Sequence, residues 1–140
     1  MRSLLATLAL APMIIFPTVA LACTPPASAA QHVAEVDTAF RGRALSSMPD
    51  PAAPGSFTIT TFEVTAPLKM LSHWSFTLNI AVRHPIADQQ SQYPTRYEIG
   101  AEALVAARVG ADGILYTTSC DVPRWPENDY RAALYLAPAP

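Results

Sequence analysis

The sequence predicts a mainly β domain: a small closed or nearly closed barrel of five strands, with a short helix before it and a second helix after it. Three observations support this class. Residues 74–82 alternate between large apolar and small polar side chains, which is the period of a strand with one buried face. The sequence Gly-Ala-Asp-Gly at 110–113 marks a turn between two further apolar runs. A proline followed by acidic and then apolar residues predicts a helix near the end of the chain.

The first 22 residues have the order of a secretory signal peptide, and the predicted domain occupies residues 23–140. One basic residue precedes a long uncharged apolar run that ends in small residues, as at a cleavage site. Cleavage after Ala22 would make Cys23 the first residue of an exported protein, either periplasmic or extracellular. Two alternatives stay open at this point: cleavage after Ala29, and a lipid attached to Cys23, which would hold the protein on a membrane.

The first predicted elements are a short helix at residues 29–36 and a strand at 37–47, after a lead-in rich in proline and alanine. Phe40 and Leu45 are the expected core residues of this strand. Gly42 lies between them, at a position where a bulge or the close approach of another segment is tolerated because glycine has no side chain.

Residues 48–55 hold three prolines and are predicted to form a loop, because proline cannot donate to a sheet ladder. The next strand is expected at 56–64, where β-branched and aromatic residues are frequent, and Pro67 is expected to close it. A third strand at 74–82 and a polar, proline-containing loop at 83–97 follow. The apolar face of the third strand comprises Trp74, Phe76, Leu78, Ile80 and Val82.

The last two strands are predicted at 97–109 and 114–120, joined by the glycine-containing turn. Alanine and glutamate would also suit a helix over the first of these segments, but the adjoining turn favours a strand. In the tail, Pro126 stands where a helix begins, acidic residues follow in its first turn, and Pro138 ends the pattern.

The charge balance argues against nucleic acid as a partner. Beyond the predicted signal peptide the chain carries eight lysines and arginines against eleven aspartates and glutamates, a net charge of −3. The basic residues are scattered along the chain, whereas a nucleic-acid ligand requires clustered basic residues that release counterions.

No spacing of reactive residues indicates an enzyme, a metal site or a cofactor. Ser119 lies outside any Gly-x-Ser-x-Gly context. The histidines are too far apart for a local ligand motif, and no two carboxylates are singled out as an acid–base pair. These groups are His32, His73 and His84, and Asp88, Glu98, Glu102, Asp112 and Asp121. We therefore expect no catalytic residue, no metal of the protein's own and no cofactor.

The two cysteines are expected to form one disulfide, between Cys23 and Cys120, because an exported protein resides in an oxidising compartment. The chain has neither a Cys-x-x-Cys motif nor a basic cluster beside a cysteine, so a structural bridge is favoured over a redox role. Cleavage after Ala29 would instead leave Cys120 unpaired.

The two tryptophans present a choice between stacking on a ligand and packing in the core. Trp74 lies on the apolar face of its predicted strand, and Trp125 follows the last strand. Core packing is the expectation for both, because aromatic side chains usually bury large areas.

Several strings, in this order, resemble the netrin-like domain, in particular the amino-terminal domain of the tissue inhibitors of metalloproteinases, including bacterial proteins of that kind. Together they span most of residues 23–125. The strings are ACTPP after the signal peptide, AFRGRALS in the first strand, FTITTFEVTAPLK ending in a basic residue, and the closing hairpin YEIGAEALVAARVGADGILYTTSCDVPRW. The resemblance implies a five-stranded Greek-key barrel of the OB type with flanking helices.

In that family the free α-amino group and carbonyl oxygen of an amino-terminal cysteine chelate the catalytic zinc of the target protease. Carried over by position, the resemblance implies that Cys23 supplies these backbone atoms and that Thr24 enters the specificity pocket. Pro25 and Pro26 would stiffen the segment that follows. Family inhibitors begin Cys-x-Cys, whereas this chain has a single cysteine there. One bridge in place of two would hold the segment less rigidly.

The sequence and the resemblance together predict an exported, non-enzymatic protein-binding module that inhibits a zinc metalloprotease through Cys23–Pro26. The alternative is an envelope or periplasmic binding or structural module without protease inhibition, attached to a membrane only if Cys23 carries a lipid. The expected partner is accordingly a zinc metalloprotease or another envelope protein.

Overall fold

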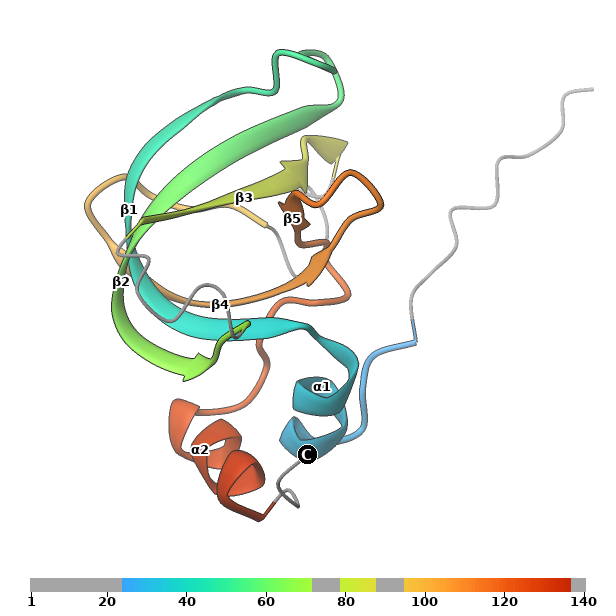
Figure 1. Cartoon of the computed structure of the whole chain (residues 1–140), viewed down its shortest axis with the longest axis vertical. Helices are drawn as coiled ribbons and strands as arrows, with labels where there is room; N and C mark the ends of the chain where they lie inside the picture. The colour runs from blue at the N-terminus through green and yellow to red at the C-terminus, as the bar shows by residue number, and fades with distance from the viewer. Residues whose placement is uncertain (1–23, 72–78, 88–94, 137–140) are drawn as a thin grey trace, which may run out of the picture.

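The computed structural model describes residues 24–71, 79–87 and 95–136, and it is mainly β, with five strands and two helices (Figure 1). In chain order the elements are α1 Ala29–Glu35, β1 Thr38–Pro49, β2 Phe57–Lys69, β3 Asn79–Pro85, β4 Glu102–Val109, β5 Leu115–Tyr116 and α2 Glu127–Leu136. The predicted mainly β class, with one helix before the strands and one after them, is confirmed. The predicted signal peptide lies outside the described residues. Within the described ranges, neither helix has the length and apolar composition needed to cross a membrane.

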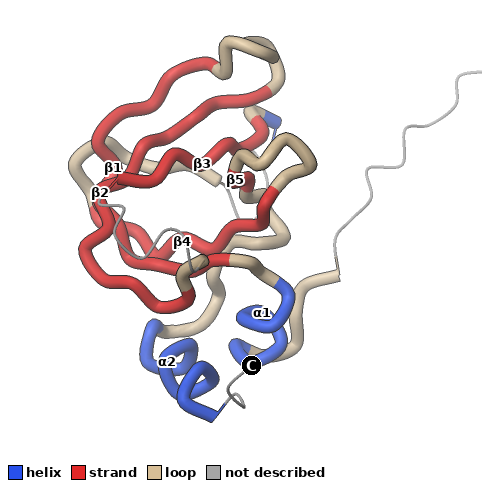
Figure 2. The backbone as a smooth tube through the Cα atoms, viewed as in Figure 1, coloured by secondary structure: helices blue, strands red, loops and turns tan. Residues whose placement is uncertain are grey.

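All five strands belong to one sheet, in which β1 pairs antiparallel with both β2 and β4. β3 pairs antiparallel with β2 and parallel with β5, and β5 pairs antiparallel with β4. The order of neighbours, β1-β2-β3-β5-β4, therefore closes on itself. In Figure 2 the strands curve round above the two helices, and α1 and α2 pack against each other.

Apolar side chains from all five strands fill the interior of the sheet, among them Phe40 and Phe62, which are fully buried. The two rings meet edge to face with centroids 5.8 Å apart. A Cβ atom at Gly42 would stand 2.9 Å from the Phe40 ring and 3.1 Å from the Phe62 Cβ. The expected close approach at Gly42 is thus confirmed. The other buried members of this core are Ala44, Ile80, Val82, Val105, Ala107 and Leu115.

The expectation that Leu45 belongs to the core is wrong, because this residue is 44% exposed. The register between β1 and β2 shifts just after Ala44, and the pairing of β1 with β4 ends one residue before it. This bulge interrupts the alternation of side chains, and β1 runs on past the core to Pro49. The predicted loop therefore begins two residues later than expected.

The expectation that Pro67 closes β2 is also wrong, because the strand continues to Lys69. Phe40 pairs with Pro67 and Ala39 pairs with Lys69, so Leu68 is the extra residue of a bulge. Proline is tolerated at a bulge because the ladder of hydrogen bonds is already interrupted there. β2 can therefore extend beyond the sheet interior towards the helices.

The described part of the third strand confirms the predicted alternation, with Ile80 and Val82 buried and Ala81 exposed between them. Residues 74–78, the first part of the predicted strand, lie outside the described residues. The strand runs on to Pro85, three residues into the predicted loop, because β2 pairs with it along its whole length.

The segment that suited both a helix and a strand is a strand, β4, which begins at Glu102 after Gly100 turns the chain with a φ of 87°. Its hairpin with β5 is confirmed. β5 is much shorter than the predicted strand at 114–120. The Thr117 N–H still donates to the Arg83 carbonyl at 2.9 Å, but the chain then enters a turn.

Candidate protein-contact site at the amino-terminal ridge

The segment implicated by the family resemblance, Cys23–Pro26, is called here the amino-terminal ridge. Cys23 lies outside the described residues. Thr24 and Pro25 are exposed, whereas Pro26 is buried. The side chain that would enter a partner's pocket is therefore accessible, and it stands two residues from a buried anchor.

The residues that follow the ridge are held by the start of α1. Ser28 is the N-cap residue, and its Oγ accepts a hydrogen bond from the Gln31 N–H at 3.1 Å. The Gln31 Oε1 accepts from the Ala27 N–H at 2.9 Å, and its Nε2 donates to Glu35 Oε1 at 2.8 Å. The bonds to the Gln31 and Ala27 N–H groups satisfy backbone donors at the start of α1 and restrain the residues that join the ridge to this helix.

α1 is anchored to α2 through His32, which is fully buried. Its Nδ1 lies 2.7 Å from the Tyr130 Oη, which also accepts a hydrogen bond from the Arg124 N–H at 3.3 Å. Tyr130 can therefore donate its own hydrogen to Nδ1 of a neutral His32 ring. The ring also lies 6.1 Å from that of Trp125. Trp125 packs against the buried residues Ala29, Val33 and Tyr130, which are called here the helix cluster. Trp125 is partly buried there, which agrees with the expectation of packing, and Trp74 lies outside the described residues.

Burial lowers the pKa of His32 below its ordinary value of 6.5, and the nearby Asp121 and Glu35 only partly oppose this effect. In the unfolded chain the ring therefore takes up a proton at a higher pH than in the folded protein. We expect the free energy of unfolding to fall as the pH drops below about 6.5, and His32 to cause no pH dependence of stability above that value.

This pH dependence can be checked by urea unfolding between about pH 8 and pH 5, where histidine titrates. The His32→Gln variant is the comparison, because it cannot take up this proton. Its stability should be lower at neutral pH and should change less on acidification. Equal acid sensitivity in both proteins would contradict the assignment.

The other end of α1 is held by Lys69, at the end of β2. Its ammonium group donates to the Val33 carbonyl at 2.8 Å and also to the Val36 carbonyl. Burial lowers the pKa of Lys69, and the neighbouring Asp37 opposes that shift. A cation at these orphan carbonyls stabilises the last turn of the helix, so both ends of α1 are tied to the rest of the domain.

Cys120 lies in a turn that Asp121 fixes. The Asp121 carboxylate pairs with Arg108 at 2.8 Å and accepts hydrogen bonds from the Thr118 N–H and Oγ1 at 3.2 and 2.9 Å. The backbone of Asp121 also acts on the pKa of His32, so this turn lies beside α1. Cys120 is half-buried and is not a free thiol. The Cys23–Cys120 bridge stays a prediction, because Cys23 lies outside the described residues.

The histidines and carboxylates considered for chemistry are dispersed where they are described. In those parts of the chain no group of three His, Cys, Asp or Glu residues could hold a metal ion. His84 lies in the sheet interior, with its Nε2 2.8 Å from the Thr60 Oγ1. His73 and Asp88 lie outside the described residues. Three of the carboxylates form ion pairs between elements: Glu102 with Arg43, Asp112 with Arg83, and Asp121 with Arg108.

No protein-family model matches the chain, and no curated protein matches it significantly.

Proposed function

We propose that the chain is a netrin-like domain whose closed sheet is a Greek-key barrel of the OB type. The order of strand neighbours supports this proposal. The one parallel pair among the described strands, β3 with β5, joins the β1-β2-β3 meander to the β4-β5 hairpin, and this pairing closes the ring of strands. The helix before β1 and the helix after β5 agree with the same architecture.

We further propose that the protein is an exported, non-enzymatic binding module that inhibits a zinc metalloprotease through its amino-terminal ridge. The observation that carries this proposal is the exposure of Thr24 and Pro25 directly before the buried Pro26. A binding segment that is accessible at its tip and fixed at its base loses little freedom on association.

The chemistry needs only backbone atoms of Cys23. A catalytic zinc keeps an open fourth position and can accept a fifth ligand, so a neutral amine nitrogen and a carbonyl oxygen can both bind it. An α-amino group has a pKa of about 8, so the metal displaces a weakly held proton near neutral pH. The hydrogen bonds made by Ala27, Ser28 and Lys69 supply part of the rigidity that a second amino-terminal cysteine would give.

The first measurement is the intact mass and amino-terminal sequence of the exported protein. A chain that starts at unmodified Cys23 and gains two hydrogens on reduction agrees with both the cleavage and the bridge. A start at Ala30, or a diacylglycerol on Cys23, would contradict the inhibitor proposal and favour the envelope module.

Adding one glycine before Cys23 is expected to weaken inhibition of a zinc endopeptidase by roughly a hundredfold, equivalent to about 2.8 kcal/mol, because the chelating amine is displaced. Inhibition would be measured with a fluorogenic peptide substrate. The matched control carries the same glycine after Pro140 and should inhibit like the unmodified protein. Unchanged inhibition after the amino-terminal addition would refute zinc chelation by Cys23.

A further inference from the structure

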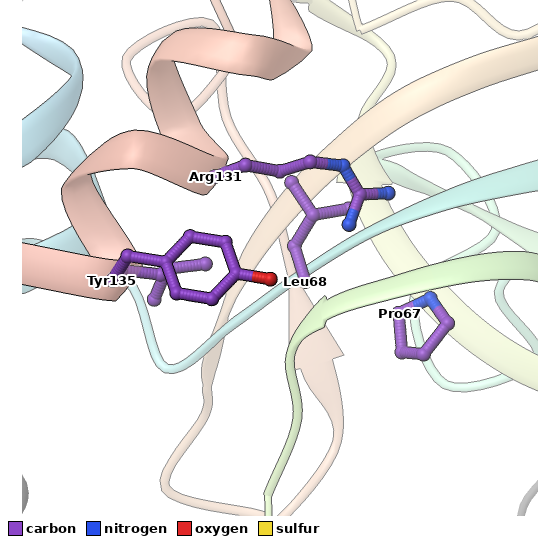
Figure 3. Close-up of a pocket in the computed structure, with 5 residues that line it drawn as sticks. Pro67, Leu68, Arg131 and Tyr135 are labelled. Atoms are coloured by element: carbon purple, nitrogen blue, oxygen red, sulfur yellow. The ribbon is translucent and has the colours of Figure 1, made fainter.

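The surface between α2 and the end of β2 holds a pocket that the amino-terminal ridge does not use. Its volume is about 290 Å³, and it is lined by Pro67, Leu68, Arg131, Leu134 and Tyr135 (Figure 3). Leu68 and Leu134 are two of its lining residues, and both are partly buried against the helix cluster. In Figure 3 the side chains of Arg131 and Tyr135 both extend from α2 towards the end of β2.

Tyr135 is the most exposed large apolar residue in the described chain, at 88%. A tyrosine normally buries much of its ring, and tyrosine and arginine are the residue types that most often dominate binding at protein interfaces. Arg131 stands one helical turn before it, so the two side chains lie on the same face of α2.

The charge of this face is positive. The Glu127 carboxylate accepts hydrogen bonds from Arg131 at 2.8 Å and pairs with Arg41 at 2.9 Å. Two cations thus share one carboxylate, which leaves one unit of positive charge on a protein whose net charge is −2. Asp129 lies on the opposite side of the helix by its periodicity. The same pairing holds the Arg131 guanidinium in position before any partner arrives.

We propose that this pocket docks an extended segment of a partner protein in which an apolar side chain stands beside a carboxylate. The apolar side chain lies against Leu68 and Leu134 and is covered by the Tyr135 ring. The carboxylate pairs with the Arg131 guanidinium, a charge-assisted contact that carries geometric specificity. In Figure 1 the residues before α1 leave the domain on the side away from α2 and the end of β2. The two surfaces can therefore be occupied together.

The test is selection of a random peptide library on the full exported protein, after depletion on the Tyr135→Ala variant. We expect recovered peptides to place Asp or Glu beside a large apolar residue. Their affinity should fall by about tenfold or more on Tyr135→Ala and on Arg131→Gln. It should also fall with added salt, and when the peptide's Asp or Glu is replaced by Asn or Gln.

The matched control is Met48→Ala, which removes an exposed apolar side chain on β1. Met48 pairs with Ile59, whereas the pocket residue Pro67 pairs with Phe40, eight residues earlier on β1. Peptide affinity should be unchanged on this variant, and circular dichroism should show that all variants are folded. Failure to recover peptides, peptides without acidic residues, or equal affinity on Tyr135→Ala would each overturn the proposal. A Tyr135-dependent dimer in sedimentation would overturn the proposed occupant, because a second copy would then fill the pocket.

Discussion

Replacing Phe62 with alanine is expected to lower the free energy of unfolding by about 4 kcal/mol, the largest loss we expect from one substitution in this protein. Phe62 is fully buried on β2. Its ring meets Phe40 and Tyr97 edge to face, with centroids 5.8 and 4.8 Å away. Because β2 is paired on both sides at this position, the strands cannot collapse into the space that alanine would leave.

The loss can be measured by urea unfolding followed by circular dichroism. Leu45→Ala is the matched control, since it truncates a large apolar side chain on the neighbouring strand that is exposed. Its effect should stay within about 0.5 kcal/mol. Similar losses in the two variants would contradict the burial of Phe62 and the exposure of Leu45.

Replacing Arg83 with methionine is expected to cost about 3 kcal/mol, the lower end of the range for breaking a buried ion pair. The Arg83 side chain is 18% exposed, and its Nε lies 2.6 Å from the carboxylate of Asp50, which is 4% exposed. A second nitrogen lies 2.6 Å from Asp112, and this contact lowers the pKa of that carboxyl. Methionine keeps the apolar stem but leaves the Asp50 charge buried without its partner.

Two further variants separate lost charge pairing from lost packing. Arg43→Met removes an exposed pair, with Arg43 and Glu102 3.7 Å apart, and should cost less than about 1 kcal/mol. Adding Asp50→Asn to Arg83→Met should recover part of the loss, because the unpaired charge is then gone. Without that recovery, the cost would come from packing of the Arg83 stem rather than from Asp50.

Much of the fold could be predicted from local patterns. The alternation at Ile80 and Val82, the turn before β5 and the proline-marked start of α2 each depend on residues close in sequence. The errors at Leu45 and Pro67 have a common cause. Both stand at bulges of the β1–β2 pair, where the register depends on the partner strand.

The supports of the candidate site could be predicted less well. Lys69 offers a weak signal, since it is the only lysine in the chain and stands beyond the strand predicted at 56–64. Nothing near Tyr130 in the sequence indicates that it meets His32, because the two residues are 98 positions apart. Such a contact depends on how α1 and α2 pack, and that packing depends on the whole sheet.

The sequence by itself therefore determined the mainly β class, the order of most elements, the charge that argues against nucleic acid, and the family resemblance that points to Cys23–Pro26. Only the tertiary structure decided that Pro26 is buried while Thr24 and Pro25 are exposed, that His32 and Lys69 hold α1, and that Tyr135 and Arg131 share a pocket. The physical reason is the distance along the chain over which each kind of interaction acts. Periodicity and turn chemistry act over a few residues, whereas burial and ion pairing depend on segments that only the closed sheet brings together.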